Sequence, residues 1–386
     1  MFGATNLGRT LLEGKPCTTR VGHARGKRGS SMATLYVAST ESASGKTALC
    51  VGLGKRLQRD GFSVGYMKPI SLTARPLEGV IVDEDAQFIK KELELQEPMS
   101  DLVPIPLDPL AVESIMKQQK WLDYPQRLLE THTRVAGDKD VMLLEGVDRL
   151  SAGGLVGLPA NEVCQLLDAK SLTVIRYVGL LTLDPVLFYR GILGDSMVGA
   201  VMNSVSQRLT DSAQEIAKPY LQREGILVYG ILPEDRFLMS VSVSELAQAL
   251  EVDIIARADK GGELVENLMV GAMTSDIALS YFRRKPNKAV ITGGDRSDIQ
   301  LAALQTSTKC LILTGNLRPQ DMILGVAKES GVPIIVSKHD TLTTVEIVER
   351  FFGRARFQQE KKIERFEELL DEHFDFTSLY VTLGLK

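Results

Sequence analysis

The sequence has few of the residues that build zinc sites. Its 386 residues include four histidines and four cysteines. The cysteines are widely spaced and form no C-x-x-C pair, so a zinc site is not expected. The same spacing favours a reducing compartment, and we expect a cytoplasmic protein. The four are Cys17, Cys50, Cys164 and Cys310.

The sequence also lacks the features of membrane proteins and of nucleic-acid binders. No run of about 18 apolar residues is present, so no segment is expected to cross a membrane. The net charge of −4 argues against a general nucleic-acid binder. The apolar fraction of 44% and the charged fraction of 24% are ordinary for a soluble globular protein. The length suggests two or three domains.

Residues 1–31 differ from the rest of the chain in charge. They carry six Lys or Arg and a single acid, Glu13, which gives +5 and, from a total of −4, leaves −9 for the remainder. The segment is rich in Gly and has no clear periodicity, so we expect a disordered extension outside the fold. Its composition is compatible with a transit peptide. A mis-called start or a non-native extension is favoured, because Met32 stands directly before the first predicted strand.

The chain is organised around residues 33–47, ATLYVASTESASGKT. An apolar strand over 35–38 leads into a loop of small residues, and a helix is predicted over 48–60. Strand, loop and helix in this order are the context of a P-loop, whose backbone N–H groups and helix N-terminus attract phosphate. Lys46 is expected to reach the β- and γ-phosphates, and the Thr47 hydroxyl to hold Mg²⁺. The predicted nucleotide-binding residues of this segment are Thr40, Ser42, Ser44, Gly45, Lys46, Thr47 and Ala48.

One position departs from the usual P-loop pattern. The pattern has Gly at position 40, whereas this chain has Thr40, which tolerates positive φ poorly. We therefore expect the loop to start differently. The alternative interpretation is a plain strand–turn–helix that contains GKT by accident.

Polar side chains are predicted at the carboxyl ends of three further strands, the edge where α/β folds bind ligands. Lys68 follows a strand over 64–67 and could pair with a phosphate or carboxylate. Glu145 ends a buried strand in Val141–Gly146 and suits a Walker-B-like carboxylate on Mg²⁺. Asn203 lies in a strand over 197–205 and could contact a base edge. Each also has a structural interpretation: a solvated Lys, an acid at a strand end and a turn-forming Asn.

Two carboxylates open the helix predicted within residues 80–95. Asp83 or Asp85 is expected to cap that helix, and these side chains could also face the metal of the P-loop.

The order of the elements predicts an α/β fold in two parts. Strands and helices alternate up to about residue 250, which indicates a doubly wound, mostly parallel sheet. Beyond residue 255 the pattern of apolar and polar residues changes. Strands predicted over 288–292, 309–314 and 332–336 indicate a second, smaller α/β domain. A long helical stretch is predicted over 112–136, and an amphipathic helix over 357–374 packs back or meets a partner. The predicted domains are residues 32–255 and 256–355, followed by a tail over 356–386.

Two strands of the second domain end in the same way. Thr292–Arg296 and Thr314–Arg318 both read T-G-x-x-R. Gly turns with Arg at one sheet edge could hold an anion, such as a phosphorylated metabolite. The alternative is ordinary βα turns whose Arg side chains pair with nearby aspartates. The predicted second anion site consists of Gly293, Gly294, Arg296, Gly315 and Arg318.

The first domain resembles dethiobiotin synthetase and its relatives, including cobyrinic acid a,c-diamide synthases. The resemblance rests on S-T-E-S-A-S-G-K-T (39–47), G-Y-M-K-P (65–69), L-L-E-G (143–146) and G-A-V-M-N (199–203). From Met32 onwards the chain resembles the N-terminal portion of long phosphate acetyltransferases, a P-loop domain followed by a DRTGG domain. That likeness rests on V-D-E-D-A (82–86), G-I-L-P-E-D-R (230–236), V-G-A-M (270–273) and I-T-G-G-D-R-S-D-I-Q-L-A-A-L (291–304).

These resemblances imply roles for single residues. Lys46 and Lys68 take the place of the catalytic lysines, with Ser71 beside the second of them. Thr47, Asp85 and Glu145 are implied as Mg²⁺ ligands, and Asn203 as the adenine contact.

For the whole chain the likeness implies ATP and Mg²⁺ binding with a regulatory or sensor role. Acetyl transfer by these residues alone is not expected, because the chain ends at Lys386 without the acetyltransferase part. An ATPase or an ATP-dependent ligase or carboxylase is the alternative. The expected partners are a nucleotide, a small phosphorylated effector and a second copy of the chain, with neither nucleic acid nor a membrane.

Overall fold

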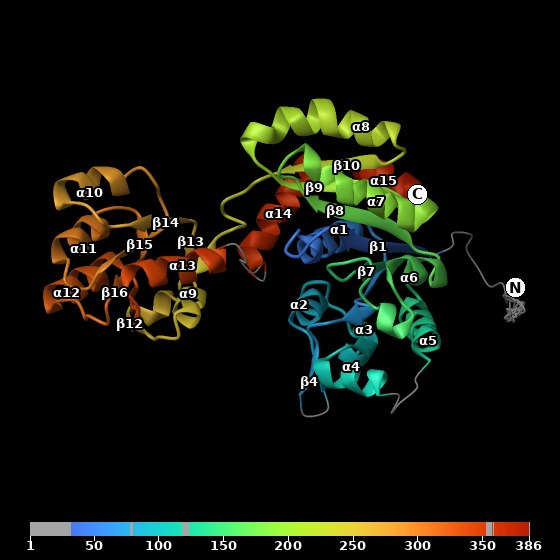
Figure 1. The fold of residues 1–386 in the computed structure, drawn as a ribbon, viewed down its shortest axis with the longest axis horizontal. Coiled ribbons are helices and arrows are strands. Elements are labelled where there is room, and N and C mark those ends of the chain that lie inside the picture. The colour runs from blue at the N-terminus through green and yellow to red at the C-terminus, as the bar shows by residue number, and fades with distance from the viewer. Residues whose placement is uncertain (1–31, 78–79, 118–122, 353–356, 358, 386) are drawn as a thin grey trace, which may run out of the picture. The chain divides into compact units, whose positions relative to one another are not determined.

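The computed structural model describes residues 32–77, 80–117, 123–352, 357 and 359–385 (Figure 1). The predicted N-terminal extension, residues 1–31, lies outside the described residues. No helix in the described part of the chain is long and apolar enough to span a membrane.

Six parallel strands form the first sheet, and β1 (Ala33–Ser39) lies between β8 and β7. All seven residues of β1 are buried, as expected for a parallel strand covered on both faces. The predicted doubly wound α/β fold is confirmed. The order across the sheet is β10 (Leu227–Pro233), β9 (Met197–Val205), β8 (Lys170–Arg176), β1, β7 (Val141–Glu145) and β2 (Val64–Met67).

Alternate residues of β1 pack into two apolar layers. Leu35 and Val37 belong to the layer on one face of the sheet, and Tyr36 and Ala38 to the layer on the other. The first layer is covered by α1 (Lys46–Arg59), α2 (Glu84–Glu92), α14 (Glu360–His373) and α15 (Phe376–Leu383). The second is covered by α5 (Tyr124–Ala136), α6 (Ala160–Leu166), α7 (Asp184–Leu193) and α8 (Lys218–Arg223).

The long helix predicted over 112–136 is wrong, because two helices occupy this region. They are α4 (Pro109–Met116) and α5, and each begins at its own capping aspartate. Asp108 accepts a hydrogen bond from the Ala111 backbone, and Asp123 accepts one from Gln126. The Pro-rich segment before α4 contains two short elements, α3 (Met99–Leu102) and β6 (Ile105–Pro106). Strand β6 pairs with β3 (Ile70–Ser71), and β4 (Arg75–Leu77) pairs with β5 (Val80–Val82).

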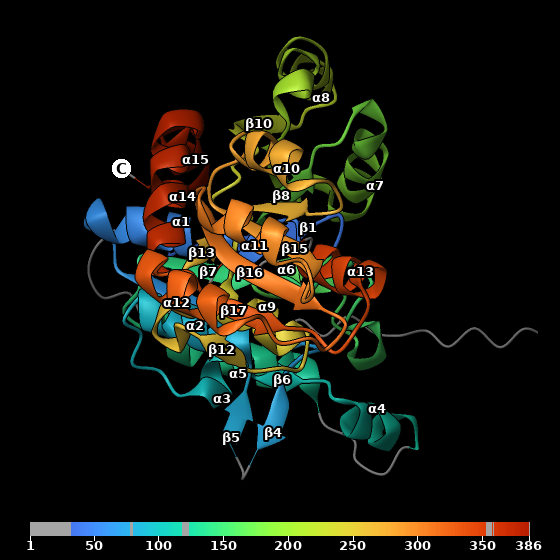
Figure 2. The ribbon, with the colours of Figure 1, turned by 90° about the vertical axis from the view of Figure 1, so that its left-hand side faces the viewer.

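A second sheet of five strands forms the other α/β domain (Figure 2). Four of its strands are parallel, and the edge strand β12 runs antiparallel to β17. The order is β12 (Ile254–Ala256), β17 (Ile334–Val336), β16 (Thr308–Thr314), β15 (Lys288–Gly293) and β14 (Asn267–Val270). Apolar side chains of α10 (Ser275–Phe282), α11 (Ser297–Leu304) and α12 (Asp321–Ser330) cover one face, and those of α9 (Val243–Ala249) and α13 (Thr341–Phe352) the other.

The second domain begins before the predicted boundary at residue 255. Strand β11 (Val241–Ser242) pairs with β13 (Leu264–Val265), and Val243 and Leu246 of α9 lie in the second domain's core. The apolar periodicity of α9 shows that the helix is buried, but not on which sheet it packs.

The C-terminal helices belong to the first domain, which is therefore built from two separate stretches of chain. Phe366 and Leu370 of α14 lie in the same apolar layer as α1. One stretch of chain leaves the first domain and the other returns to it. A hydrogen bond joins them, because Lys362 Nζ donates to the Ser240 carbonyl over 2.6 Å. Burial lowers the pKa of Lys362 to about 8. Arg365 adds an ion pair with Asp235 at 2.8 Å.

Candidate functional site

The loop after β1 includes left-handed backbone conformations immediately before α1. Gly45 immediately precedes α1 with φ of 100°, a conformation that L side chains rarely adopt. A Cβ on Gly45 would lie 2.4 Å from the Asn203 amide nitrogen, so both the conformation and the space require Gly. Within this described loop the other residue with positive φ is Ala43, at 55°. Thr40 therefore avoids the strained region, and its presence is compatible with the loop.

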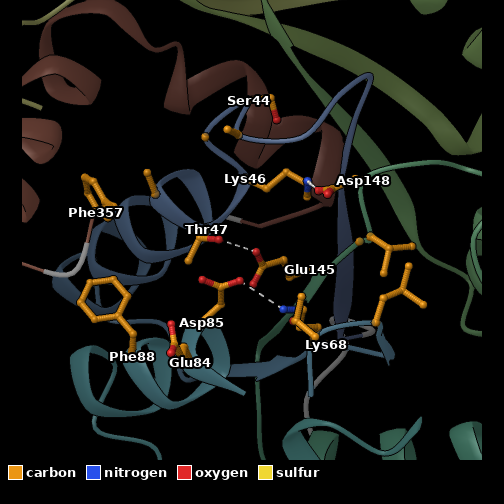
Figure 3. Close-up of a pocket in the computed structure, with 17 residues that line it drawn as sticks. Ser44, Lys46, Thr47, Lys68, Glu84, Asp85, Phe88, Glu145, Asp148 and Phe357 are labelled. Atoms are coloured by element: carbon orange, nitrogen blue, oxygen red, sulfur yellow. Dashed lines mark hydrogen bonds and ion pairs between the residues drawn. The ribbon is translucent and has the colours of Figure 1, made fainter. Parts of the chain in front are cut away.

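A cavity of about 380 Å³ opens beside this loop and the first turn of α1 (Figure 3). It brings together side chains from the loop, from the ends of β2 and β7, and from the first turns of α2. Lys46, Thr47, Lys68, Asp85 and Glu145, predicted from sequence, all line it. The full lining is Ala43, Ser44, Gly45, Lys46, Thr47, Ala48, Lys68, Leu72, Thr73, Glu84, Asp85, Phe88, Glu145, Gly146, Val147, Asp148 and Phe357.

The ammonium group of Lys46 is held by an acid that the sequence analysis missed. Lys46 Nζ donates to Ser39 Oγ and to Asp148 Oδ1, each at 2.7 Å. The second oxygen of Asp148 accepts from Ser42 Oγ at 2.7 Å. Burial alone would raise the pKa of Asp148, but the bonds from Lys46 and Ser42 outweigh it and lower that pKa. The Asp148 carboxylate thus occupies two donors, the Ser42 hydroxyl and the Lys46 ammonium. Its position just after β7, near Glu145, was the available signal in the sequence.

Glu145 lies at the end of β7, fixed by two hydroxyl groups. Thr47 Oγ1 donates to one carboxylate oxygen and Tyr66 OH to the other, both at 2.6 Å. The residue is only 2% exposed. Burial raises the pKa of Glu145, although Lys68 and the two hydroxyls act in the opposite direction. The carboxylate is therefore oriented beside the Thr47 hydroxyl, at the edge of the cavity.

Lys68 forms a buried cationic centre on the opposite side of the cavity from the loop. Its Nζ lies 3.1 Å from Asp83 and 3.2 Å from Asp85. Burial would lower the pKa of Lys68, but the negative charges of Glu145, Asp83 and Asp85 outweigh this and raise it. Lys68 is therefore a permanent cation at neutral pH.

The structure separates the roles of the two acids that open α2. Asp83 is buried and caps the helix, accepting from the Ala86 backbone at 2.9 Å and from Ser71 Oγ at 2.5 Å. Burial would raise the pKa of Asp83, but Lys68, Ser71 and Ala86 lower it. The side chain of Asp85 is 44% exposed and lines the cavity. Of the two acids, Asp85 is thus the one available to a ligand.

Asn203 supports the loop in this structure. Its amide nitrogen donates to the Ser44 carbonyl at 2.8 Å, and its amide oxygen accepts from the Ser204 backbone at 2.9 Å. Both polar ends of the side chain are therefore engaged, and contact with adenine stays a prediction. Among the described residues, the Ser44 hydroxyl, which is buried at the cavity, has no hydrogen-bond partner.

Comparison with known proteins agrees with this geometry. The family model described as an AAA domain matches residues 33–242, and the one described as a DRTGG domain matches residues 245–351. The chain belongs to this AAA domain family. Both parts of the AAA–DRTGG arrangement thus match the resemblance drawn from the motifs.

Individual relatives match either the whole AAA–DRTGG arrangement or a part of it. A phosphate acetyltransferase from Synechocystis sp. is 25% identical over 336 residues, covering 81% of this chain and 46% of that protein. An ATP-dependent dethiobiotin synthetase from Caldicellulosiruptor saccharolyticus is 24% identical over 132 residues, covering 34% of this chain and 52% of that protein. The chain thus spans about half the length of the curated relatives it matches.

Among solved structures, one match contains the DRTGG fold. It holds the CBS and DRTGG domains of the regulatory region of Clostridium perfringens pyrophosphatase, complexed with the activator diadenosine tetraphosphate. The sequences are 17% identical and the TM-score is 0.26, with 39% of this chain and 72% of that chain covered.

In the DRTGG domain, the two predicted anion-binding turns lie next to each other. A Cβ on Gly294 would lie 2.2 Å from the Leu317 carbonyl oxygen. Arg296 forms an ion pair with Asp298 at 3.0 Å, as the alternative interpretation of ordinary βα turns predicts. It also donates to the Met273 carbonyl at 2.9 Å. Arg318 is exposed. An anion at these turns stays a prediction, and Arg296 would have to leave Asp298 to bind it.

Proposed function

We propose that this chain is a regulatory or sensor protein whose AAA domain binds ATP together with Mg²⁺. The observation that carries the proposal is the convergence of Lys46, Thr47 and Glu145 on one cavity at the N-terminus of α1. Backbone N–H groups at a helix N-terminus attract phosphate, and a buried lysine beside them adds a full positive charge. ATP supplies the phosphates that such a site stabilises.

On this proposal, the phosphates of the nucleotide replace the Asp148 carboxylate as the acceptor of the Lys46 and Ser42 hydrogen bonds. The ammonium of Lys46 and the hydroxyl of Ser42 bond Asp148, whose side chain is half exposed. The β- and γ-phosphates take over these donors, and Asp148 turns towards solvent. Lys68 faces the same cavity and adds a second cation near the terminal phosphate.

The donors beside the loop fit Mg²⁺. Thr47, Glu145 and Asp85 offer only oxygen atoms, which is the ligand type that Mg²⁺ prefers. Within the described residues, no group of three or more His, Cys, Asp or Glu forms a ready-made metal cage. This suits an ion held by one or two carboxylates and by the phosphates themselves. When bound, Mg²⁺ neutralises phosphate charge, while Thr47 and Glu145 orient it.

The regulatory part of the proposal rests on how the DRTGG domain is connected. It lies in the sequence between the two stretches that build the AAA domain, and Lys362 bonds the Ser240 carbonyl where those stretches meet. A conformational change in the DRTGG domain would therefore displace two segments of the AAA domain that are hydrogen-bonded to each other. Phosphate acetyltransferases among the relatives favour a cytoplasmic role in acetyl-phosphate or related carbon metabolism. A small phosphorylated effector and a homo-oligomer complete the proposal.

The Glu145→Gln substitution tests the metal site. Gln keeps the shape of the side chain but removes its charge. We therefore expect the increase in ATP affinity that Mg²⁺ produces to be about 10- to 100-fold smaller than in the wild type. Affinity for ATP without metal should stay similar. Calorimetric titration with ATP, in Mg²⁺ and in a chelator, measures both quantities.

The two acids of α2 provide a matched control for this experiment. Asp85→Asn should act in the same direction as Glu145→Gln, because Asp85 lines the cavity. Asp83→Asn changes an acid outside the lining, one that caps α2. An effect on Mg²⁺ dependence from Asp83→Asn alone would show that the wrong carboxylate has been assigned.

The position of Lys68 favours a second candidate function, an ATP-dependent ligase or carboxylase. Lys46 and Lys68 line the same cavity and could stabilise a phosphoryl group in transfer. The two candidates differ in turnover. ADP release that requires a small carboxylic acid or amine, and is lost in Lys68→Ala, would support the ligase. Binding of ATP with negligible turnover across a metabolite panel would support the sensor.

A further inference from the structure

Tyr66 is a buried tyrosine whose hydroxyl bonds one of the acids proposed to bind Mg²⁺. It lies in β2, the edge strand of the first sheet, and its exposed fraction is 0%. The hydroxyl donates to Glu145 Oε2 at 2.6 Å. A hydroxyl at a fully buried position needs a hydrogen-bond partner. Here the partner is a carboxylate at the edge of the cavity, so the core of the domain contacts the site through this bond.

The two carboxylate oxygens of Glu145 are held from different sides. Oε1 accepts from the Thr47 hydroxyl at 2.6 Å, and Thr47 lines the cavity (Figure 3). Oε2 accepts from Tyr66, which belongs to the apolar layer that α1 covers and lies outside the cavity lining. The bond from Tyr66 therefore holds Oε2 on the core side and leaves Oε1 beside the Thr47 hydroxyl.

This arrangement suits a small divalent cation better than a large one. Mg²⁺ keeps several waters and binds through one or two carboxylates, whereas Ca²⁺ takes about six to eight oxygens and commonly both oxygens of a carboxylate. Glu145 could offer both oxygens only by breaking its bond with Tyr66. The Tyr66 hydroxyl would then be buried without a partner, and that cost falls on Ca²⁺ but not on Mg²⁺.

We propose that Tyr66 is a positioning residue that makes the cavity select Mg²⁺ over Ca²⁺. This inference rests on the proposed function and specifies the cation preference of the same site. Tyr66 acts through Glu145, by restricting that carboxylate to one oxygen. The hydroxyl carries the effect, because the ring packs in the apolar layer.

The Tyr66→Phe substitution tests this role, since it removes the hydroxyl and keeps the buried ring. The whole chain is titrated with ATP by calorimetry in Mg²⁺, in Ca²⁺ and in a chelator. The ratio of ATP affinity in Mg²⁺ to that in Ca²⁺ should fall by about 5- to 150-fold, which corresponds to the cost of an unpaired buried hydroxyl. ATP affinity in the chelator should not change, whereas a general loosening of the fold would lower it under all three conditions.

Two further variants separate this role from a general effect of a lost buried hydroxyl. Tyr229 lies in the same apolar layer, is 2% exposed and donates to Thr382 Oγ1 at 2.9 Å. It is outside the cavity lining, so Tyr229→Phe should leave the affinity ratio unchanged. In the Glu145→Gln background, Tyr66→Phe should change the ratio no further, because Tyr66 acts through the carboxylate.

The outcomes distinguish this inference from the proposed function. A wild-type chain that binds ATP equally well in Mg²⁺ and in Ca²⁺ would overturn the role of Tyr66 and leave nucleotide binding intact. The same holds if the affinity ratio of Tyr66→Phe equals that of the wild type. Absence of ATP binding by the wild type under all three conditions would overturn both proposals.

Discussion

Replacing Lys46 by Ala is expected to remove the rise in melting temperature that ATP and Mg²⁺ produce. A ligand that binds only the folded chain stabilises it by about 2.7 kcal/mol at a hundredfold excess over Kd. Lys46 is the buried cation of the loop, and its ammonium reaches both Ser39 and Asp148. Without that charge the cavity keeps its acids but loses the cation nearest the phosphates. Thermal unfolding with and without ATP measures the difference.

Two further variants make the Lys46 experiment specific. Lys55 lies on the same helix and pairs with Glu92 at 3.2 Å, away from the cavity, so Lys55→Ala should keep the full shift. Asp148→Ala should act in the opposite direction, because it frees Lys46 and Ser42 for phosphate. At a fixed, subsaturating ATP concentration its shift should exceed that of the wild type. A full shift in Lys46→Ala would refute the P-loop assignment.

Replacing Phe366 by Ala is expected to lower the free energy of unfolding by about 3–5 kcal/mol, the usual cost of deleting a buried aromatic ring. Phe366 is 3% exposed and packs in the same layer as α1. The helices approach so closely that a Cβ on Gly52 would lie 2.3 Å from Leu370 and 3.2 Å from Phe366. The Phe366 ring therefore fills the space between α14 and α1, and its removal would leave a cavity there. Denaturant unfolding of the whole chain measures the loss.

Phe188, on α7, is the matched control for Phe366 because its ring is 65% exposed. Phe188→Ala removes the same atoms from the surface, where substitutions usually change stability by less than about 0.5 kcal/mol. If Phe366→Ala also cost less than about 1 kcal/mol, α14 would not be part of the first domain's core in solution.

The P-loop and its neighbours could be predicted because their signals are local. Residues 33–47 combine an apolar strand, a loop of small residues and a helix start, and β7 is a continuous apolar run that ends in Glu145. In a parallel sheet the carboxyl ends of all strands meet at one edge, so sequence alone brings Lys46, Lys68 and Glu145 together.

The other features depend on contacts between residues that are distant in sequence. Asp148 reaches Lys46 across 102 positions, and no periodicity encodes that pair. The roles of Asp83 and Asp85 follow from the direction in which α2 enters the site, which spacing does not determine. Likewise, an amphipathic pattern shows that α14 buries one face, but only the fold shows that this face packs against α1.

Calorimetric titration of the whole chain with ATP in the presence of Mg²⁺ measures nucleotide binding at the P-loop. We expect one saturable site per chain, with weaker binding in a chelator and no binding in Lys46→Ala. No saturable heat from the wild-type chain at millimolar ATP would show that this cavity is not a nucleotide site.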